Sequence, residues 1–120
     1  MFRRARELQA LESDSAGMAF HPGLQAELAD LVLTKPRVSA FYGTSLEAAL
    51  RANRVERLII AGVSTVWAVE STIRDAHDRD FEVLLLPEAC AAANQQEHEE
   101  AIQRLSRIAT PLSVAELAAL

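Results

Sequence analysis

The 120-residue sequence predicts an α/β fold in which a parallel sheet carries helices on both of its faces. Three apolar runs, at residues 31–34, 57–61 and 81–86, have the length of strands. None of them alternates strictly between apolar and polar residues, which is typical of strands that are buried on both faces. Helical patterns separate the runs, as in strand–helix–strand units, and the length suits one domain over residues 1–120.

Apolar spacing and capping patterns predict the helices. Two capping-box patterns, Thr44 with Glu47 and Ser113 with Glu116, mark helix starts because each pair can satisfy the first free backbone N–H groups. The predicted helices cover residues 2–12, 44–53, 66–79 and 95–108, and a last short helix begins near residue 113.

The composition narrows the function classes. The net charge of −5 comes without any basic cluster, which argues against nucleic acid as a partner. No apolar run approaches the ~20 residues of a membrane span, and the basic N-terminus lacks the apolar stretch of a signal peptide. Cys90 is the single cysteine, so an internal disulfide is excluded and a reducing compartment fits. We therefore expect a cytoplasmic protein that contacts neither nucleic acid nor membrane.

Three stretches of sequence, in this order and spacing, carry a family resemblance. They are LTKPRVSAFYGTSL at residues 33–46, GVSTVWAVESTIRDAHDRDFEV at residues 62–83 and EHEEAIQRLS at residues 97–106. Together they resemble the isochorismatase-like cysteine hydrolases, which include isochorismatases, nicotinamidases and N-carbamoylsarcosine amidases. The resemblance covers roughly residues 15–120 and leaves residues 1–14 as a helical N-terminal extension.

The resemblance implies a three-layer α/β/α, Rossmann-like fold and a Cys-Asp-Lys catalytic arrangement. The lysine matches Lys35, but the cysteine position is occupied by Ala68. The aspartate belongs on an early strand far upstream, and only 67 residues precede Ala68. Two of the three catalytic groups are thus missing, which predicts a naturally degenerate and truncated family member, with an artificially shortened chain as the alternative. The resemblance also implies a cis peptide bond between Val63 and Ser64.

The remaining candidate residues for a ligand site lie around Lys35 and around the turn at Ala68. Lys35 is interpreted as a cation that binds an anion at the pocket floor, or as a strand-end lysine that reaches solvent. The backbone N–H groups near Trp67 and Ala68 are candidates for binding an oxyanion or a carboxylate. The other candidates for substrate binding are His21, Arg37, Ser39, Phe41, Tyr42, Ser64, Thr65, Trp67 and Glu70.

Several of these residues also have a structural interpretation. Arg37 suits a surface salt bridge as well as a bound carboxylate, and Tyr42 suits half-buried packing. Trp67 is interpreted as a packing residue that fills the space of the missing strands, or as a surface that stacks on a planar ligand. Glu70 is a candidate acid or base, but a first-turn glutamate also suits the helix dipole. His21 is a candidate general base or an ordinary loop histidine.

Further residues are expected outside the site. His77 and His98 are expected in solvent, and Cys90 as a buried small hydrophobic residue. Ser64 and Thr65, although candidates for substrate binding, are also interpreted as turn residues, without the neighbours of a serine hydrolase. No cluster has metal-ligand spacing, so we expect neither a metal nor another cofactor.

The sequence leaves three functions open. The first is binding of a small polar or carboxylated metabolite, with any catalysis by positioning and acid–base chemistry rather than a covalent cysteine intermediate. The second is a non-catalytic pseudoenzyme that acts as a binding or partner subunit. The third and weaker one is a hydrolase of this family that another chain completes.

The missing strands also predict a partner. The family's sheet has the order 3-2-1-4-5-6, so the strand at residues 58–61 is left with one bare edge and the strand at residues 31–34 without neighbours. A bare apolar edge promotes association. We therefore expect a homodimer formed by strand pairing or exchange, and the competing arrangement places residues 31–34 beside residues 58–61 within one chain.

Overall fold

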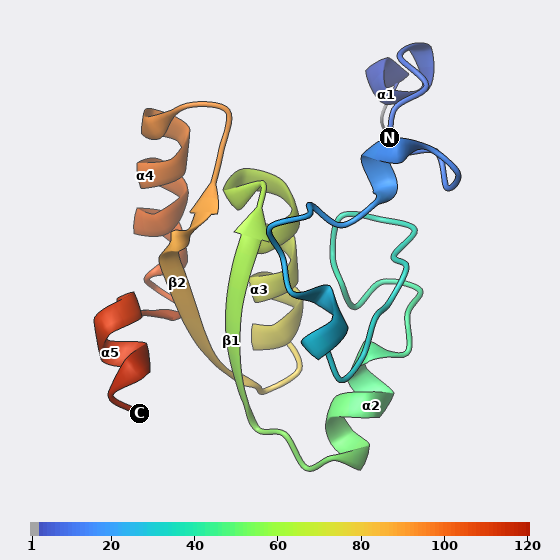
Figure 1. Cartoon of the computed structure of the whole chain (residues 1–120). Coiled ribbons are helices and arrows are strands. Elements are labelled where there is room, and N and C mark those ends of the chain that lie inside the picture. The colour runs from blue at the N-terminus through green and yellow to red at the C-terminus, as the bar shows by residue number, and fades with distance from the viewer. Residues whose placement is uncertain (1–2) are drawn as a thin grey trace. The chain divides into compact units, whose positions relative to one another are not determined.

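The computed structural model describes residues 3–120 and divides the chain into two compact units (Figure 1). The first unit ends at Val32, and the second runs from Leu33 to Leu120. The site residues at positions 35–70 all lie in the second unit. The single domain expected over residues 1–120 stays a prediction.

The first unit holds only short helical segments, namely α1 (Arg3–Glu7), η1 (Ala16–Met18) and η2 (Ala26–Leu28). The helix predicted over residues 2–12 is therefore shorter than expected, and its first residue, Phe2, lies outside the described residues. Gln9 and Leu11 both adopt left-handed backbone conformations, with φ of 49° and 63°, which a helix cannot accommodate. Leu8 and Leu11 are exposed, so no packing of their apolar side chains extends the helix.

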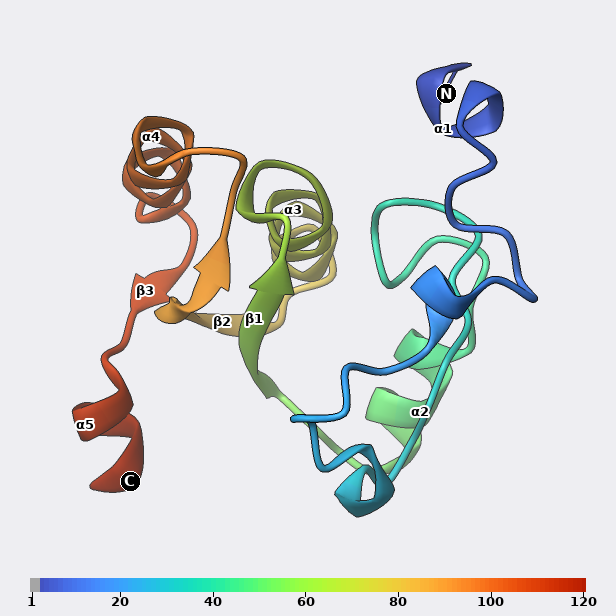
Figure 2. The same cartoon turned by 45° about the horizontal axis from the view of Figure 1, so that its top comes forward.

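The second unit confirms the predicted α/β class. Its elements are α2 (Leu46–Ala52), β1 (Arg57–Val63), η3 (Thr65–Val69), α3 (Glu70–His77), β2 (Glu82–Ala91), α4 (Gln95–Leu105), β3 (Thr110–Pro111) and α5 (Val114–Ala118). The three strands form a parallel sheet in the order β1-β2-β3. Figure 2 shows β3 beside β2, with α3 and α4 lying side by side.

The register between β1 and β2 changes just before the turn that follows β1. Arg57 pairs with Glu82 and Ile60 with Leu85, but Gly62 then pairs with Cys90, so β2 carries extra residues at this point. Gly62 has a φ of 134°, a conformation that side-chain-bearing residues rarely adopt. The irregular pairing therefore lies at the end of β1, directly before the turn at Ser64.

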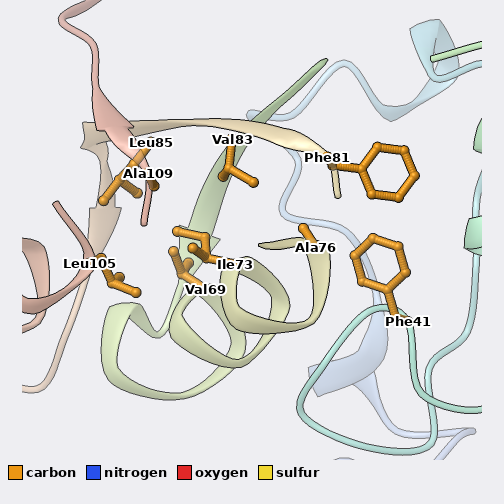
Figure 3. Close-up of a cluster of buried hydrophobic side chains, with 9 residues drawn as sticks. All are labelled: Phe41, Val69, Ile73, Ala76, Phe81, Val83, Leu85, Leu105 and Ala109. Carbon is orange, nitrogen blue, oxygen red and sulfur yellow. The ribbon is translucent and has the colours of Figure 1, made fainter. Parts of the chain in front are cut away.

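The core lies between the sheet and the helices α3 and α4. Val83 and Leu85 of β2 point into it, Ile73 comes from α3, and Leu105 comes from α4 (Figure 3). Ile73, Leu85 and Leu105 are fully buried, so both helices pack on the same face of β2. This packing fixes where α3 begins, and therefore where the turn at Ala68 lies.

Phe41 extends this core toward the loop that carries Lys35. Its ring centroid lies 6.0 Å from that of Phe81, and both side chains are buried (Figure 3). The Arg79 guanidinium lies 5.0 Å from the Phe41 ring centroid, and Arg51 lies 4.2 Å from that of Phe81. The loop is therefore anchored to the sheet by an aromatic pair with a cation on each ring.

The strand predicted at residues 31–34 is wrong, because these residues form no strand in the structure. Leu31 and Val32 are exposed, and no strand within residues 3–120 pairs with them. An apolar run becomes a strand only when a neighbour takes its backbone hydrogen bonds. The other two predicted strands are confirmed and extend further, to Val63 and to Ala91, whereas β3 was not predicted.

The two capping predictions have different outcomes. Ser113 and Glu116 form the complete capping box at the start of α5. The pattern at Thr44 and Glu47 is not a capping box, because Thr44 accepts from the Leu46 N–H at 3.3 Å and Glu47 instead binds Arg79 at 2.9 Å. The predicted helix is confirmed, but it begins at Leu46 rather than at residue 44.

Candidate functional site

The candidate site is the turn between β1 and α3. The Val63–Ser64 peptide bond is cis, as the family resemblance implies. Residues Thr65–Val69 form one π-helical turn that continues directly into α3. The Ser64 carbonyl oxygen accepts from the Trp67 N–H at 3.1 Å and from the Val69 N–H at 3.2 Å. The Trp67 amide, one of the two predicted to bind an oxyanion, therefore donates within the turn.

Ala68 and Trp67 occupy this turn. Ala68 is half-buried, and its methyl group stands at the position that the resemblance assigns to the nucleophile. Trp67 is 59% exposed, so the interpretation of Trp67 as a packed plug is wrong. An exposed indole beside Ala68 presents an apolar surface next to the turn.

Thr65 links the turn to α4. Its side chain is fully buried, and its Oγ1 lies 2.9 Å from His98 Nδ1. His98 is half-buried, so its predicted place in solvent is wrong. The sequence contained a signal for this, because His98 precedes Ala101 by three residues and Leu105 by seven, which places it on the buried face of α4.

Glu70 begins α3 and is held by two arginines. Its carboxylate accepts hydrogen bonds from Arg74 Nη2 at 2.9 Å and from Arg104 Nη2 at 3.2 Å. Burial alone acts to raise the pKa of Glu70, but the hydrogen bonds from Arg74 and Arg104 outweigh it and lower the pKa overall. Glu70 therefore joins α3 to α4 through Arg104, and its role as an acid or base stays a prediction.

Replacing Glu70 with glutamine is expected to destabilise the protein by about 1–2 kcal/mol at neutral pH, because charge-assisted hydrogen bonds to two arginines are lost. Because the pKa of Glu70 is lower in the folded than in the unfolded chain, ionised Glu70 stabilises the fold at pH values above its unfolded-state pKa of about 4.3. This contribution is lost as the pH falls through the pKa of the folded state. Urea unfolding of both proteins between neutral and acidic pH measures the difference. The difference in stability between the two proteins is expected to narrow toward acidic pH, and an unchanged difference contradicts the assignment. Glu100→Gln, at an exposed position of α4, is the control.

In the loop that carries Lys35, the cationic side chains of Lys35 and Arg37 donate hydrogen bonds to backbone carbonyl oxygens of the same loop. Lys35 Nζ donates to the carbonyl oxygens of Arg37 and Val38, each at 3.0 Å. Arg37 Nη1 donates to the Pro36 carbonyl oxygen at 2.7 Å, and both side chains are exposed. These bonds hold the loop in a compact turn.

The remaining loop residues differ in how far they can meet a ligand. Ser39 is buried, and its Oγ accepts from the Phe41 N–H at 3.2 Å. Phe41 belongs to the core, so its predicted place lining an open pocket is not what the structure has. Tyr42 is exposed, and half-buried packing of its ring is therefore wrong.

One hydrogen bond brings the loop to the helix of the candidate site. The Ala40 N–H donates to Thr72 Oγ1 at 3.1 Å, and Thr72 lies one helical turn beyond Ala68. His21 lies in the other unit, where its Nδ1 accepts from the Gly23 N–H at 3.0 Å. A role for His21 at this site stays a prediction.

A pocket that the sequence did not predict lies at the carboxyl end of β2 and the start of α4. Its volume is about 340 Å³, and it is lined by Pro87, Glu88, Cys90, Ala91, Ala92, Asn94, Gln95 and His98. Cys90 Sγ donates to the Leu86 carbonyl oxygen at 3.3 Å, and burial raises the pKa of this thiol. His98 lines the pocket and also forms a hydrogen bond with Thr65, so it connects the pocket to the turn.

Two further features, a metal site and a membrane-spanning helix, are absent from the described part of the chain. Among residues 3–120, no three His, Cys, Asp or Glu side chains are grouped so as to hold a metal ion. None of the helices in these residues is both long enough and apolar enough to cross a membrane.

The parallel sheet and the cis-peptide turn before α3 define an α/β protein whose candidate site lies at the turn between a strand and a helix. The chain belongs to the isochorismatase family, because the family model described as "Isochorismatase domain" matches residues 1–116. This confirms the resemblance that the three sequence stretches carry.

The curated relatives of the chain are longer proteins. An uncharacterized isochorismatase family protein, YecD, from Escherichia coli O157:H7 is 37% identical over 99 residues, which is 81% of this chain and 53% of that protein. The ureidoacrylate amidohydrolase RutB of Methylorubrum extorquens is 38% identical over 81 residues, which is 68% of this chain and 33% of that protein. The chain thus spans about half of the first relative and a third of the second.

Solved structures share the fold. An isochorismatase-like hydrolase from Alkaliphilus metalliredigens has a TM-score of 0.87 at 24% identity, a likeness of fold that covers 92% of this chain and 62% of that chain. Nicotinamidase PncA from Bacillus subtilis has a TM-score of 0.63 at 34% identity and covers 66% of this chain and 44% of that chain. The relatives are therefore hydrolases or proteins of the same family.

Proposed function

We propose that this chain is a degenerate isochorismatase-family protein that binds a small polar or carboxylated molecule without hydrolysing it through a covalent cysteine intermediate. The observation that carries this proposal is Ala68, which stands on the turn where the family resemblance requires a thiol. A methyl group cannot attack a carbonyl carbon. The single cysteine, Cys90, lies elsewhere, and its raised pKa keeps it in the unreactive thiol form.

The pocket at the end of β2 supports binding. In open α/β sheets, ligands bind beyond the carboxyl ends of the strands. Asn94, Gln95 and His98 supply amide and imidazole groups there, which suit a polar ligand. Glu70 is a poor general acid, because its hydrogen bonds from two arginines favour the ionised carboxylate, which carries no proton to donate.

A partner-subunit function is the second candidate, and the exposed apolar side chains of Ile59 and Val63 on β1 favour it. A hydrolase completed by another chain remains the weaker alternative, because such a chain supplies an aspartate but leaves Ala68 unchanged.

The test uses molecules on which the named relatives act. Nicotinamide and ureidoacrylate are incubated with the purified chain while product is measured, and binding of nicotinamide and its carboxylate, nicotinate, is followed by calorimetry. We expect binding in the millimolar range (on the order of −4 kcal/mol) and no turnover. Turnover that iodoacetamide abolishes contradicts the proposal, because Cys90 is the only thiol.

Gln95 and Gln96 provide a matched pair of variants for the pocket. Gln95 Nε2 donates to Glu99 at 2.8 Å and Gln96 Nε2 to Glu100 at 2.9 Å, but only Gln95 lines the pocket. Gln95→Ala is expected to weaken nicotinate binding about threefold to tenfold through one lost hydrogen bond, and Gln96→Ala to leave it unchanged. Equal effects of the two variants place the ligand outside this pocket.

A further inference from the structure

A buried hydroxyl group lies beside the imidazole ring of His98. The Thr65 side chain is fully buried in the turn, and its Oγ1 lies 2.9 Å from His98 Nδ1. Within residues 3–120, this nitrogen is the only hydrogen-bond partner of Thr65 Oγ1. A buried hydroxyl hydrogen without an acceptor is costly, so Thr65 donates this hydrogen bond and Nδ1 accepts it.

This hydrogen bond selects one tautomer of the ring. In a neutral imidazole, one ring nitrogen carries the hydrogen and the other is an acceptor. Because Nδ1 accepts from Thr65, the hydrogen of neutral His98 lies on Nε2. The opposite tautomer would leave the buried hydroxyl hydrogen of Thr65 without an acceptor.

The Nε2–H group is available to a ligand of the pocket at the end of β2. His98 is half-buried and lines this pocket, and within residues 3–120 its Nε2 has no hydrogen-bond partner. The other polar side chains of the lining are engaged within the chain, since Asn94, Gln95 and Cys90 each donate a hydrogen bond and Glu88 accepts one. A ligand can therefore pair with Nε2–H without breaking a hydrogen bond of the chain.

We propose that His98 determines what this pocket binds, because its Nε2–H donates to a carboxylate or carbonyl oxygen of a small molecule while Thr65 holds the ring in this tautomer. The inference rests on the proposed function, since it assigns the recognising group of the same pocket. A donor that meets an apolar group is left unpaired. The pocket therefore favours a molecule with such an oxygen over an analogue that has the same ring without it.

The tautomer is measured first, without a ligand. NMR of the ring nitrogens distinguishes a protonated from an unprotonated nitrogen, and the His98→Gln variant identifies the signals of His98 among the 3 histidines. We expect the neutral form of His98 to carry its hydrogen on Nε2. A neutral form with the hydrogen on Nδ1 overturns the inference and leaves the proposed function standing.

Two variants then separate the roles of the two ring nitrogens. Asparagine places its amide near the position of Nδ1 and glutamine near that of Nε2, so His98→Asn loses the donor in the pocket whereas His98→Gln keeps it. In calorimetry, His98→Asn is expected to weaken nicotinate binding about threefold to tenfold, the effect of one hydrogen bond, and His98→Gln to retain most of it. His77→Asn, at an exposed position of α3, is the matched control and is expected to change nothing.

A second compound separates recognition of the oxygen from the shape of the pocket. The methyl analogue of nicotinate, in which a methyl group replaces the carboxylate, is expected to bind the wild-type chain more weakly and to bind His98→Asn equally well as the wild type. Circular dichroism confirms that the variants fold.

The remaining outcomes overturn the inference. Equal nicotinate binding by the wild-type chain and His98→Asn does so while leaving the proposed function intact, because another group then holds the carboxylate. An equal loss for both compounds also does so, because His98 then acts through the shape of the pocket. A wild-type chain that binds neither compound overturns the proposed function, and this inference with it.

Discussion

Replacing Leu85 with alanine is expected to lower the free energy of unfolding by about 3–4 kcal/mol, the cost of a cavity at a fully buried leucine. Leu85 is completely buried on the middle strand, β2, where it packs against residues of both α3 and α4. A small domain has a total stability of about 5–15 kcal/mol, so this one substitution removes a large part of it. Urea unfolding followed by circular dichroism measures the change as a shift of the midpoint at constant slope.

Leu120 provides the matched control for this prediction. It is also a leucine, but it is 77% exposed, and Leu120→Ala is expected to change the free energy of unfolding by less than about 0.5 kcal/mol. A loss of under about 1 kcal/mol for Leu85→Ala contradicts the placement of this residue in the core, because both the lost burial of three carbons and the cavity left behind predict a larger loss.

The difference between residues 31–34 and residues 57–61 shows how far the sequence determines the fold. Both are apolar runs of strand length, yet only the second becomes a strand, because β2 lies beside it and takes its hydrogen bonds. A local pattern of residues does not report which neighbour is present. The short strand β3 was missed for the opposite reason, since two residues carry no pattern and pair only through the sheet.

Some features of the site likewise follow from one stretch of sequence, whereas others depend on residues that are far apart in the chain. The cis peptide bond and the position of Ala68 follow from the motif, which is one continuous stretch of sequence. The bond between Thr65 and His98 joins residues 33 positions apart, so only the periodicity of α4 pointed to it. The bonds from Lys35 to its own loop were not foreseen, because a family match assigns a residue a role without giving the direction of its side chain.

Ala68→Cys, in a Cys90→Ala background, is expected to create a thiol that iodoacetamide alkylates at least about tenfold faster at neutral pH than it alkylates Cys90 of the wild-type chain. Position 68 is half-buried and lies in the first turn of the continuous helix formed by η3 and α3, where the helix dipole stabilises a thiolate. Burial acts in the opposite direction at Cys90, where it raises the pKa. Intact-mass spectrometry over time gives both rates.

Ser71→Cys in the same background is the control, because position 71 is half-buried on the same helix but lies further from its start. The thiol at position 71 is expected to react more slowly than the one at position 68, and equal rates contradict the idea that this turn still activates a nucleophile. The Ala68→Cys variant is also expected to leave nicotinamide intact, since nucleophilic catalysis needs a base as well as a thiol. If the variant hydrolyses nicotinamide, the chain already contains that base, and the single residue Ala68 accounts for the whole loss of hydrolysis.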